Sequence, residues 1–222
     1  AMAHSNNCTS DLNAWVNVFK EFAEAMGMEV DMNKLFGTLY NKALEGDADC
    51  GGILSYGNYA GEPITNVEKG RPMVVRTPET KFNLANFMRS HLYTALGVIK
   101  VGMDILTKDE GVEIDTVLGH GGLFKTKGVG QQILADAVNA PVSVMATAGE
   151  GGAWGIALLA SYLVNKEEGE TLESFLDNKV FADQESSTLD PKPEGVAGFN
   201  AFMDSYMKGL SIERAAVESE IW

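Results

Sequence analysis

Residues 117–164 read VLGHGGLFKTKGVGQQILADAVNAPVSVMATAGEGGAWGIALLASYLV, and this stretch decides the fold class. Its pattern predicts a strand, a glycine loop and a helix, followed by a second strand, glycine loop and helix. If the two strands are parallel, both glycine loops lie at the carboxyl edge of the sheet, where α/β proteins bind ligands. Backbone amides at such a turn and at a helix N-terminus suit phosphate.

Apolar spacing supports this reading of the stretch. Val129, Ile133 and Ala137 recur on one stripe, which is the pattern of an amphipathic helix. Pro141–Met145 is a short β-branched segment opened by proline, and a second apolar helix then runs through Leu158. The sequence therefore predicts two successive strand–helix units.

Glycine turns of this kind also occur for packing alone, so they do not by themselves define a nucleotide site. The dinucleotide fingerprint GxGxxG fails because Phe124 stands where its third glycine belongs, which disfavours a dinucleotide-binding oxidoreductase domain. A P-loop is absent because no GKS or GKT occurs in the chain. His120 lies in the first loop, where local hydrogen bonding is the favoured role and catalysis the minor alternative.

Composition restricts the class of protein. The chain has 222 residues, 45% of them hydrophobic, and a net charge of −14, so we expect one domain with a sizeable core. The acidic balance argues against nucleic-acid and anionic-membrane partners, which need a basic surface. The apolar run Gly155–Val164 is too short for a membrane span and predicts a buried helix. Two cysteines without a CxxC motif, and no secretory leader, predict free thiols in the cytoplasm.

The sequence predicts no metal site within the chain. His4, His91 and His120 are far apart and lack the spacing of metal ligands.

The remaining chain predicts mostly helix. We expect helices, short strands and a final amphipathic helix over the following ranges: helices at 9–26, 31–44 and 83–106, short strands within 51–64 and 73–76, and the final helix after Gly195. Gly97 and Gly102 would weaken the long helix unless another element packs closely there. The acidic segment 166–195 predicts one short helix near Leu172–Leu176 and otherwise surface loop.

Several motifs occur in the order found in a known family. They are Asn6–Phe19, Tyr59–Pro63, His91–Ala95, Gly119–Leu123, Gln132–Asp136, Pro141-Val142 and Ala153–Ala157. In this order they resemble the second, C-terminal domain of the FGGY carbohydrate kinases, and Asn6–Phe19 is most similar to the xylulokinase and ribulokinase-like branch.

The resemblance implies an actin-like, ribonuclease-H-like ATPase domain, a three-layer α/β/α fold with a mixed sheet that lacks its first strands. It also implies transfer of the ATP γ-phosphate to a hydroxyl of a ketopentose or related sugar, with Mg²⁺. The implied ATP-binding residues form two walls, Gly119, Gly121, Gly122 and Leu123 in one and Gly152, Ala153 and Gly155 in the other.

The same resemblance implies that residues 1–222 are the nucleotide-binding lobe and that the N-terminal, sugar-binding domain is missing. The family's general-base aspartate lies in that first domain, so we expect no catalytic residue in this chain and no activity of the chain alone. Asp11, Asp115 and Asp136 do not replace the base, and Glu150 is at most a loop-fixing or ribose-contacting residue.

Two alternatives stay open. Pro63 and Thr94 stand where the family often has arginines, and residues 97–99 stand where an acidic residue is common. These departures favour a non-catalytic regulatory or interaction module with the same fold. A homodimer is also possible, and the sequence does not identify the sugar.

Overall fold

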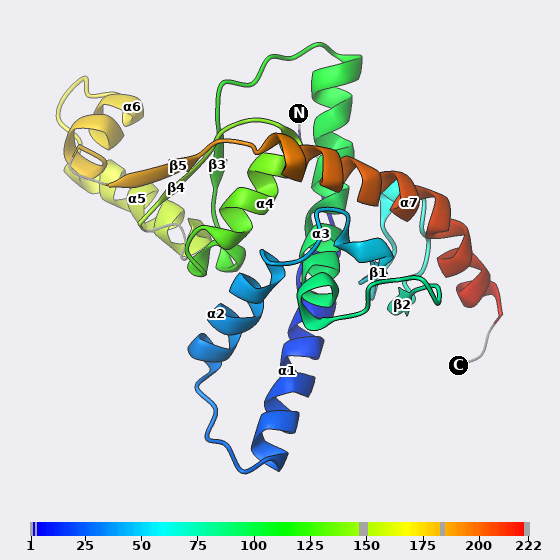
Figure 1. The fold of residues 1–222 in the computed structure, drawn as a ribbon. Coiled ribbons are helices and arrows are strands. Elements are labelled where there is room, and N and C mark those ends of the chain that lie inside the picture. The colour runs from blue at the N-terminus through cyan, green and yellow to red at the C-terminus, as the bar shows by residue number, and fades with distance from the viewer. Residues whose placement is uncertain (1, 3, 147–150, 183–184, 220–222) are drawn as a thin grey trace.

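The computed structural model describes residues 2, 4–146, 151–182 and 185–219 (Figure 1). Its helices are α1 (Ser10–Ala25), α2 (Met32–Ala43), α3 (Leu84–Asp104), α4 (Val129–Val138), α5 (Gly151–Asn165), α6 (Leu172–Phe175) and α7 (Pro193–Glu218). Its strands are β1 (Leu54–Tyr56), β2 (Met73–Val75), β3 (Val117–Gly119), β4 (Val142–Met145) and β5 (Ser186–Leu189). Short 3-10 turns cover Cys50–Gly52, Pro63–Thr65 and Gly122–Lys125, and π-helical turns cover Ile105–Asp109 and Leu176–Val180.

The strands form two separate sheets. In the larger sheet β3 pairs with β4 in parallel, with Val117 opposite Val142, and β4 pairs with β5 antiparallel, with Val142 opposite Leu189. β1 and β2 form an antiparallel pair of their own, on the opposite side of α3 from the larger sheet (Figure 1). The predicted α/β class with a mixed sheet is confirmed, and so is the parallel pairing of the two strands in residues 117–164.

Helix α3 runs through the centre of the molecule and is surrounded by other elements (Figure 1). Its buried residues lie on all sides, from Ala85 near its start to Gly102 near its end. A helix that is buried all round must be covered by several neighbours, and α1, α2, α4, α7 and β1 all contact it. A side chain at Gly97 would meet the Met203 sulfur of α7 at 3.1 Å, so close packing does explain this glycine.

Helix α7 packs against both β1 and α3. Tyr206 stacks on Tyr56 of β1 at 4.8 Å between ring centroids, and the Tyr56 hydroxyl donates to the Tyr206 carbonyl at 3.0 Å. Phe199 packs on Tyr93 of α3 at 4.3 Å. These aromatic pairs bury large apolar area with defined geometry, so they fix α7 across both α3 and β1.

The start of α7 is held by a carboxylate from α4. Asp136 is buried, and its Oδ1 accepts a hydrogen bond from the backbone N–H of Lys192 at 2.8 Å and from Gln132 Nε2 at 2.9 Å. A negative group at a helix N-terminus satisfies free amides and interacts favourably with the helix dipole. Gly195 lies against this carboxylate, because a Cβ there would be 2.0 Å from Asp136 Oδ2.

Hydrogen bonds from side chains explain where α2 and α3 begin and where α2 ends. Asp31 and Asn83 each cap a helix by accepting from the backbone N–H three residues later, at 2.9 Å. At the end of α2, the buried Arg89 guanidinium donates to the Gly46 carbonyl at 3.1 Å and to the carbonyl of Leu44 at 3.4 Å.

Two expectations are wrong. The segment 166–195 is more than a short helix and loop, because Ser186–Leu189 forms β5 along the edge of β4. The apolar run Gly155–Val164 is helical but not buried, since Leu163 is 73% exposed and Val164 is 82% exposed. Its composition alone indicated burial, whereas among the described residues one side of α5 has no covering neighbour. Of the helices described, none combines the length and apolarity that a membrane crossing requires.

We predict that Gly195→Ala destabilises the domain by about 1–3 kcal/mol, because the added methyl group overlaps the Asp136 carboxylate. The free energy of unfolding from urea titration measures this loss. Gly37→Ala is the matched control, since no atom lies within 4 Å of a Cβ at that helical position. The control should gain about 0.5–1 kcal/mol from helix propensity. Equal stability of the two variants would contradict the proposed contact.

Candidate nucleotide site

The end of β3 and the loop that follows it contain three glycines with different roles. Gly119 is buried against Phe124, whose ring carbon would lie 2.7 Å from an added Cβ, so packing alone requires this glycine. Gly121 has φ +112°, a conformation that side chains rarely adopt. Gly122 is exposed and starts the 3-10 turn that leads to α4.

The first turn of α5 supplies the second glycine segment. A Cβ at Gly152 or Gly155 would meet no atom within 4 Å, so neither glycine is explained by packing against the described residues. This open space is what a side-chain-poor wall of a binding site requires.

The two segments meet in one cleft of about 380 Å³. It is lined by His120, Gly121, Gly152, Trp154, Gly155, Leu158 and Phe181. The cleft that the sequence predicts between the glycine loops therefore exists. Its volume and its apolar, partly aromatic lining are typical of small-molecule sites.

The structure brings together only part of the predicted ATP-binding set. Gly121, Gly152 and Gly155 line the cleft, whereas Gly119 and the side chain of Leu123 lie in the interior. The other two, Gly122 and Ala153, are exposed and do not line it.

The sequence missed the aromatic part of the cleft. Trp154 and Leu158 sit beside the glycines on α5, and the pattern Ala-Trp-Gly could have indicated the first of them. Phe181 comes from the segment read as loop, so only the tertiary fold identifies it. His120 lines the cleft as an exposed residue. Glu150, considered as a ribose contact, lies outside the described residues.

A nucleotide fits this cleft in part. A flat base suits the space between Trp154, Phe181 and the glycine wall, and the indole Nε1 of Trp154 is buried without a hydrogen-bond partner among the described groups. No lysine or arginine is among the described residues that line it, so phosphates would depend on backbone amides of the glycine loop. Within the described ranges, no cluster of three or more metal-ligating side chains is found, so Mg²⁺ would be held chiefly through phosphate oxygens.

A larger cavity of about 570 Å³ lies between the starts of α4 and β5. Its polar lining includes Lys127, Gln131 and Ser187. Gln131 is already occupied, since its Nε2 donates to the carbonyls of Val142 at 2.8 Å and Ser187 at 2.7 Å. We place the candidate site in the smaller cleft, because it contains the glycines that packing leaves unexplained.

Two family-like motifs hold the fold together. Gln132 and Asp136 of the motif Gln132–Asp136 connect α4 to the start of α7, as described above. Glu62 of Tyr59–Pro63 is fully buried, and its Oε2 accepts from the backbone N–H of Asn6 at 2.9 Å. In return, Asn7 Oδ1 accepts from the backbone N–H groups of Tyr59 and Ala60, each at 2.9 Å. These motifs therefore explain structure and not chemistry.

An Asp–His pair lies near the start of α1, and it is too enclosed for catalysis. Asp11 Oδ2 is 3.4 Å from His91 Nδ1, and His91 is only 2% exposed beneath Trp15 and Phe87. The neighbouring carboxylate would favour a charged imidazole, but burial dominates and lowers the pKa of His91 to about 4. Burial also raises the pKa of Asp11, against the hydrogen bonds from Trp15 and Tyr59.

The structure is thus an α/β domain with a mixed sheet and a glycine-walled cleft at the carboxyl edge of its parallel strands. The model of the FGGY family of carbohydrate kinases, C-terminal domain, matches residues 1–164. The chain therefore belongs to the FGGY carbohydrate kinase family, as its motifs predict. Residues 165–222 lie outside that match, although α7 packs on α3.

Several solved sugar kinases share this fold. The xylulose kinase of Rhodospirillum rubrum aligns with a TM-score of 0.63 at 16% identity, over 94% of this chain and 38% of that one. The glycerol kinase of Plasmodium falciparum, solved with ADP, aligns with a TM-score of 0.55 at 18% identity, over 93% and 37%. The gluconate kinase of Lactobacillus acidophilus aligns with a TM-score of 0.57 at 16% identity, over 78% and 34%. Among curated protein sequences none matches the chain.

We predict that the stability of the domain falls as the pH drops from about 7.5 to 4.5. The unfolded chain protonates His91 near pH 6.5, whereas the folded chain resists protonation down to about pH 4, so acid favours unfolding. The shift corresponds to a loss of about 2–3 kcal/mol over this interval.

Urea unfolding at several pH values, compared between the native chain and His91→Gln, measures this contribution. Asp11 acts in the opposite direction at the acidic end of the range, but it is present in both proteins. The variant should lose the His91 part of the pH dependence. Parallel stability curves for the two proteins would show that His91 is not buried in its neutral form.

Proposed function

We propose that this domain is the ATP-binding lobe of a sugar kinase that phosphorylates a hydroxyl of a ketopentose or related sugar, in the manner of a xylulokinase. The observation that carries the proposal is the cleft between Gly121 on one side and Gly152 and Gly155 on the other. Family membership adds the carbohydrate-kinase class. The absence of side chains from the glycine wall leaves room for a base there.

The chain's own residues would bind and orient the nucleotide. When bound, ATP with Mg²⁺ supplies the transferable phosphoryl group and the cation that neutralises its charge. Trp154 and Phe181 would contact the base, and the glycine loop after β3 would direct backbone amides towards the phosphates. Phosphoryl transfer depends mostly on such positioning and on exclusion of water.

The remaining machinery, in this proposal, belongs to a preceding domain. The chain spans 38% of the length of the Rhodospirillum rubrum kinase. The general-base aspartate and most sugar contacts would lie in that other domain, which would close on this lobe. The free thiols of Cys8 and Cys50 are in keeping with a cytoplasmic enzyme.

A non-catalytic module with the same fold is the second candidate. The two residues that stand in place of the family's arginines, Thr94 and Pro63, have structural roles here. Thr94 hydrogen-bonds Ser55 on β1, and Pro63 opens a 3-10 turn. Together with the lack of lysine and arginine among the described residues that line the cleft, these features favour a domain that kept the fold and lost the chemistry.

We predict that the chain binds a non-hydrolysable ATP analogue with Mg²⁺, and that Gly155→Leu weakens this binding at least ten-fold by filling the cleft. Calorimetric titration measures both affinities, with NAD as the control ligand. Gly37→Leu is the matched control, because a Cβ there also meets no atom within 4 Å, on helix α2, which supplies none of the residues lining the cleft. Absence of binding would favour the non-catalytic module, and preference for NAD would favour an oxidoreductase domain.

We also predict that the 222-residue chain alone phosphorylates no ketopentose, because it would lack the general base. A coupled assay for ADP release with xylulose and ribulose measures turnover. Sustained ADP release that depends on the sugar would contradict the assignment of the base to another domain.

A further inference from the structure

A small polar cavity lies where the end of α3, the end of α4 and the start of α7 come together (Figure 1). Its volume is about 320 Å³, at the lower end of the range for small-molecule sites. Its polar lining residues are Lys100, Asp104, Thr107, Lys108, Asn139 and Asn200. None of these side chains lines the glycine-walled cleft.

The cavity and the glycine-walled cleft lie at opposite edges of the larger sheet. Ile114, which precedes β3, and Ala140, which precedes β4, line the cavity. The cavity is therefore at the amino edge of the two parallel strands, whereas the cleft is at their carboxyl edge. A ligand in the cavity would be separate from a ligand in the cleft.

The cavity contains a buried cation. The side chain of Lys100 is only 8% exposed, and its ammonium forms an ion pair with Asp104, one turn later in α3. An ammonium has three N–H donors, and Asp104 is the one acceptor found for it among the described residues. Because removing a charged group from water has a high free-energy cost, the remaining donors favour an acceptor inside the cavity.

Lys108 gives the cavity an excess of positive charge. Its ammonium lies 3.0 Å from Asp104 Oδ2, so both carboxylate oxygens of Asp104 are paired with lysines. The lining residues thus carry two positive charges and one negative charge, in a chain whose net charge is −14. This local excess attracts an anion that the rest of the chain repels.

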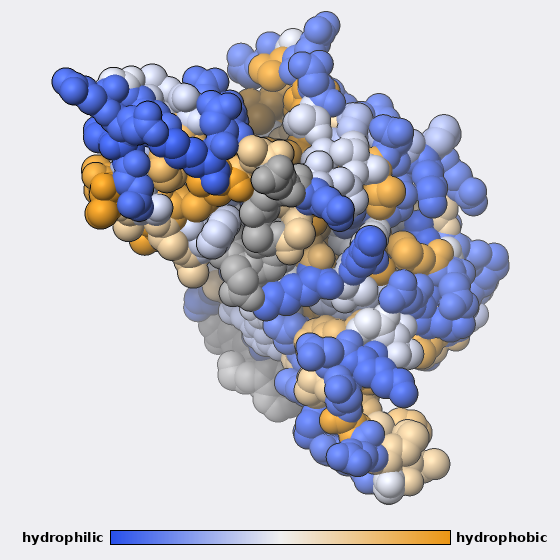
Figure 2. All heavy atoms as spheres, turned by 90° about the vertical axis from the view of Figure 1, so that its left-hand side faces the viewer, coloured by the Kyte–Doolittle hydropathy of each residue, from blue (hydrophilic) through white to orange (hydrophobic). Residues whose placement is uncertain are grey.

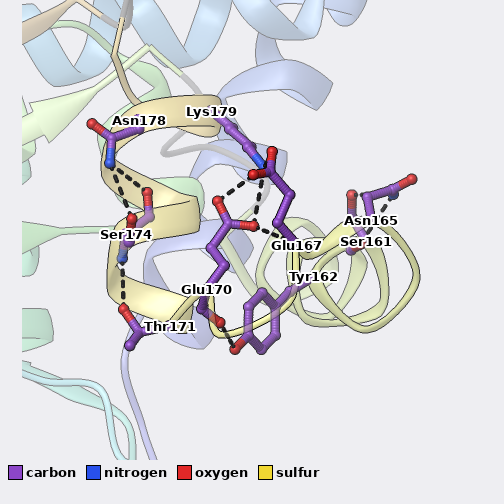
Figure 3. A network of polar contacts seen from close by, with 9 residues as sticks. All are labelled: Ser161, Tyr162, Asn165, Glu167, Glu170, Thr171, Ser174, Asn178 and Lys179. Carbon is purple, nitrogen blue, oxygen red and sulfur yellow. Dashed lines mark hydrogen bonds and ion pairs between the residues drawn. The ribbon is translucent and has the colours of Figure 1, made fainter.

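A surface ion-pair network of the same chain has the opposite balance of charge. Lys179 is 36% exposed and pairs with two carboxylates, Glu167 at 2.8 Å and Glu170 at 2.9 Å (Figure 3). Figure 2 views the molecule from the α5 side and shows a hydrophilic surface above a group of hydrophobic residues. Water and two carboxylates therefore satisfy Lys179, whereas Lys100 and Lys108 share a single carboxylate.

Two asparagines add neutral donors to the lysines. Asn139 and Asn200 are exposed residues that line the cavity, and neither side-chain amide has a hydrogen-bond partner among the described residues. Asn139 also ends α4 with a φ of +51°, which asparagine tolerates, so its position has a structural reason as well. Asn200 lies within α7, where asparagine is a weak helix former and has no such reason.

A π-helical turn at the end of α3 supplies Thr107 and Lys108. The backbone N–H of Glu110 donates to the carbonyl of Ile105 at 3.0 Å, which is the hydrogen bond that defines such a turn. Turns of this kind are rare and occur frequently at functional sites.

We propose that this cavity binds the phosphate or carboxylate group of a small metabolite. Lys100 and Lys108 would contact the anionic oxygens, and the amides of Asn139 and Asn200 would donate hydrogen bonds to them. The remaining volume would hold a small body attached to that group, against apolar residues such as Val196. The proposal is independent of whether the glycine-walled cleft binds ATP.

Calorimetric titration of the chain with inorganic phosphate, and separately with malonate, tests the proposal at constant ionic strength. We expect one site with a dissociation constant below about 1 mM for at least one of the two anions. Binding of phosphate alone would assign a phosphate as the ligand group, and binding of malonate alone would assign a carboxylate.

Lys100→Met should weaken this binding at least ten-fold, because it removes the buried cation while methionine fills the same space. Lys34→Met is the matched control, since Lys34 is exposed on α2 and the change removes the same charge outside the cavity. The control should bind like the native chain. Circular dichroism of each variant verifies that the fold is intact.

Asn200→Asp is a second variant, and it leaves every buried group in place. The added carboxylate should repel the anion and weaken binding at least ten-fold. Ser211→Asp is its matched control, because it adds the same charge at an exposed position of α7 that does not line the cavity.

Three outcomes would overturn the proposal. The first is no binding of either anion up to about 10 mM. The second is binding that a folded Lys100→Met leaves unchanged, and if that variant is unfolded, unchanged binding in Asn200→Asp has the same meaning. The third is binding that Gly155→Leu abolishes and Lys100→Met retains, which would place the anion in the glycine-walled cleft.

Discussion

The burial of α3 on all its sides is the constraint on which the rest of the domain depends. A helix that is buried on every side over Ala85–Val98 has to be enclosed by elements that precede it and elements that follow it in the sequence. α1 and α2 supply one part of that enclosure, and α4 and α7 supply the remainder. The larger sheet lies at one side of this helical core. There the loop after β3 and the start of α5 face each other across a cleft.

Much of this arrangement follows from local sequence. Helical periodicity locates α1, α2 and α3, because each has a stripe of apolar residues, and the side-chain caps Asp31 and Asn83 mark the starts of α2 and α3. The proline and β-branched residues before Met145 locate β4. The cleft between the glycine segments was predictable in place, since parallel strands bring their carboxyl ends to one edge.

Other features depend on tertiary contacts that local sequence does not encode. The four residues of β5 lack apolar alternation, and they become a strand because β4 offers an unpaired edge. Phe181 reaches the cleft through the turn after α6, which no spacing rule predicts. The exposure of α5 differs from what its composition predicts. An apolar sequence indicates that burial would be favourable, but it does not show which element buries the helix.

The family-like motifs divide into two kinds. Glu62 and Asp136 are buried carboxylates that accept backbone hydrogen bonds from distant segments, and each would leave unsatisfied amides behind if removed. Gly121, Gly152 and Gly155 have no such structural partners among the described residues. Holding the fold together and forming the cleft thus place different demands on residues that are neighbours in the sequence.

The stacking of Tyr56 on Tyr206 joins positions 150 residues apart, and this has a consequence for synthesis in the cell. During translation, β1 and α3 leave the ribosome long before α7 exists, so their aromatic surfaces stay uncovered for most of the synthesis of the chain. Contacts of such long separation slow folding, and exposed apolar surface in the interval invites aggregation. The domain should therefore engage chaperones while it is nascent, until α7 covers these aromatic surfaces.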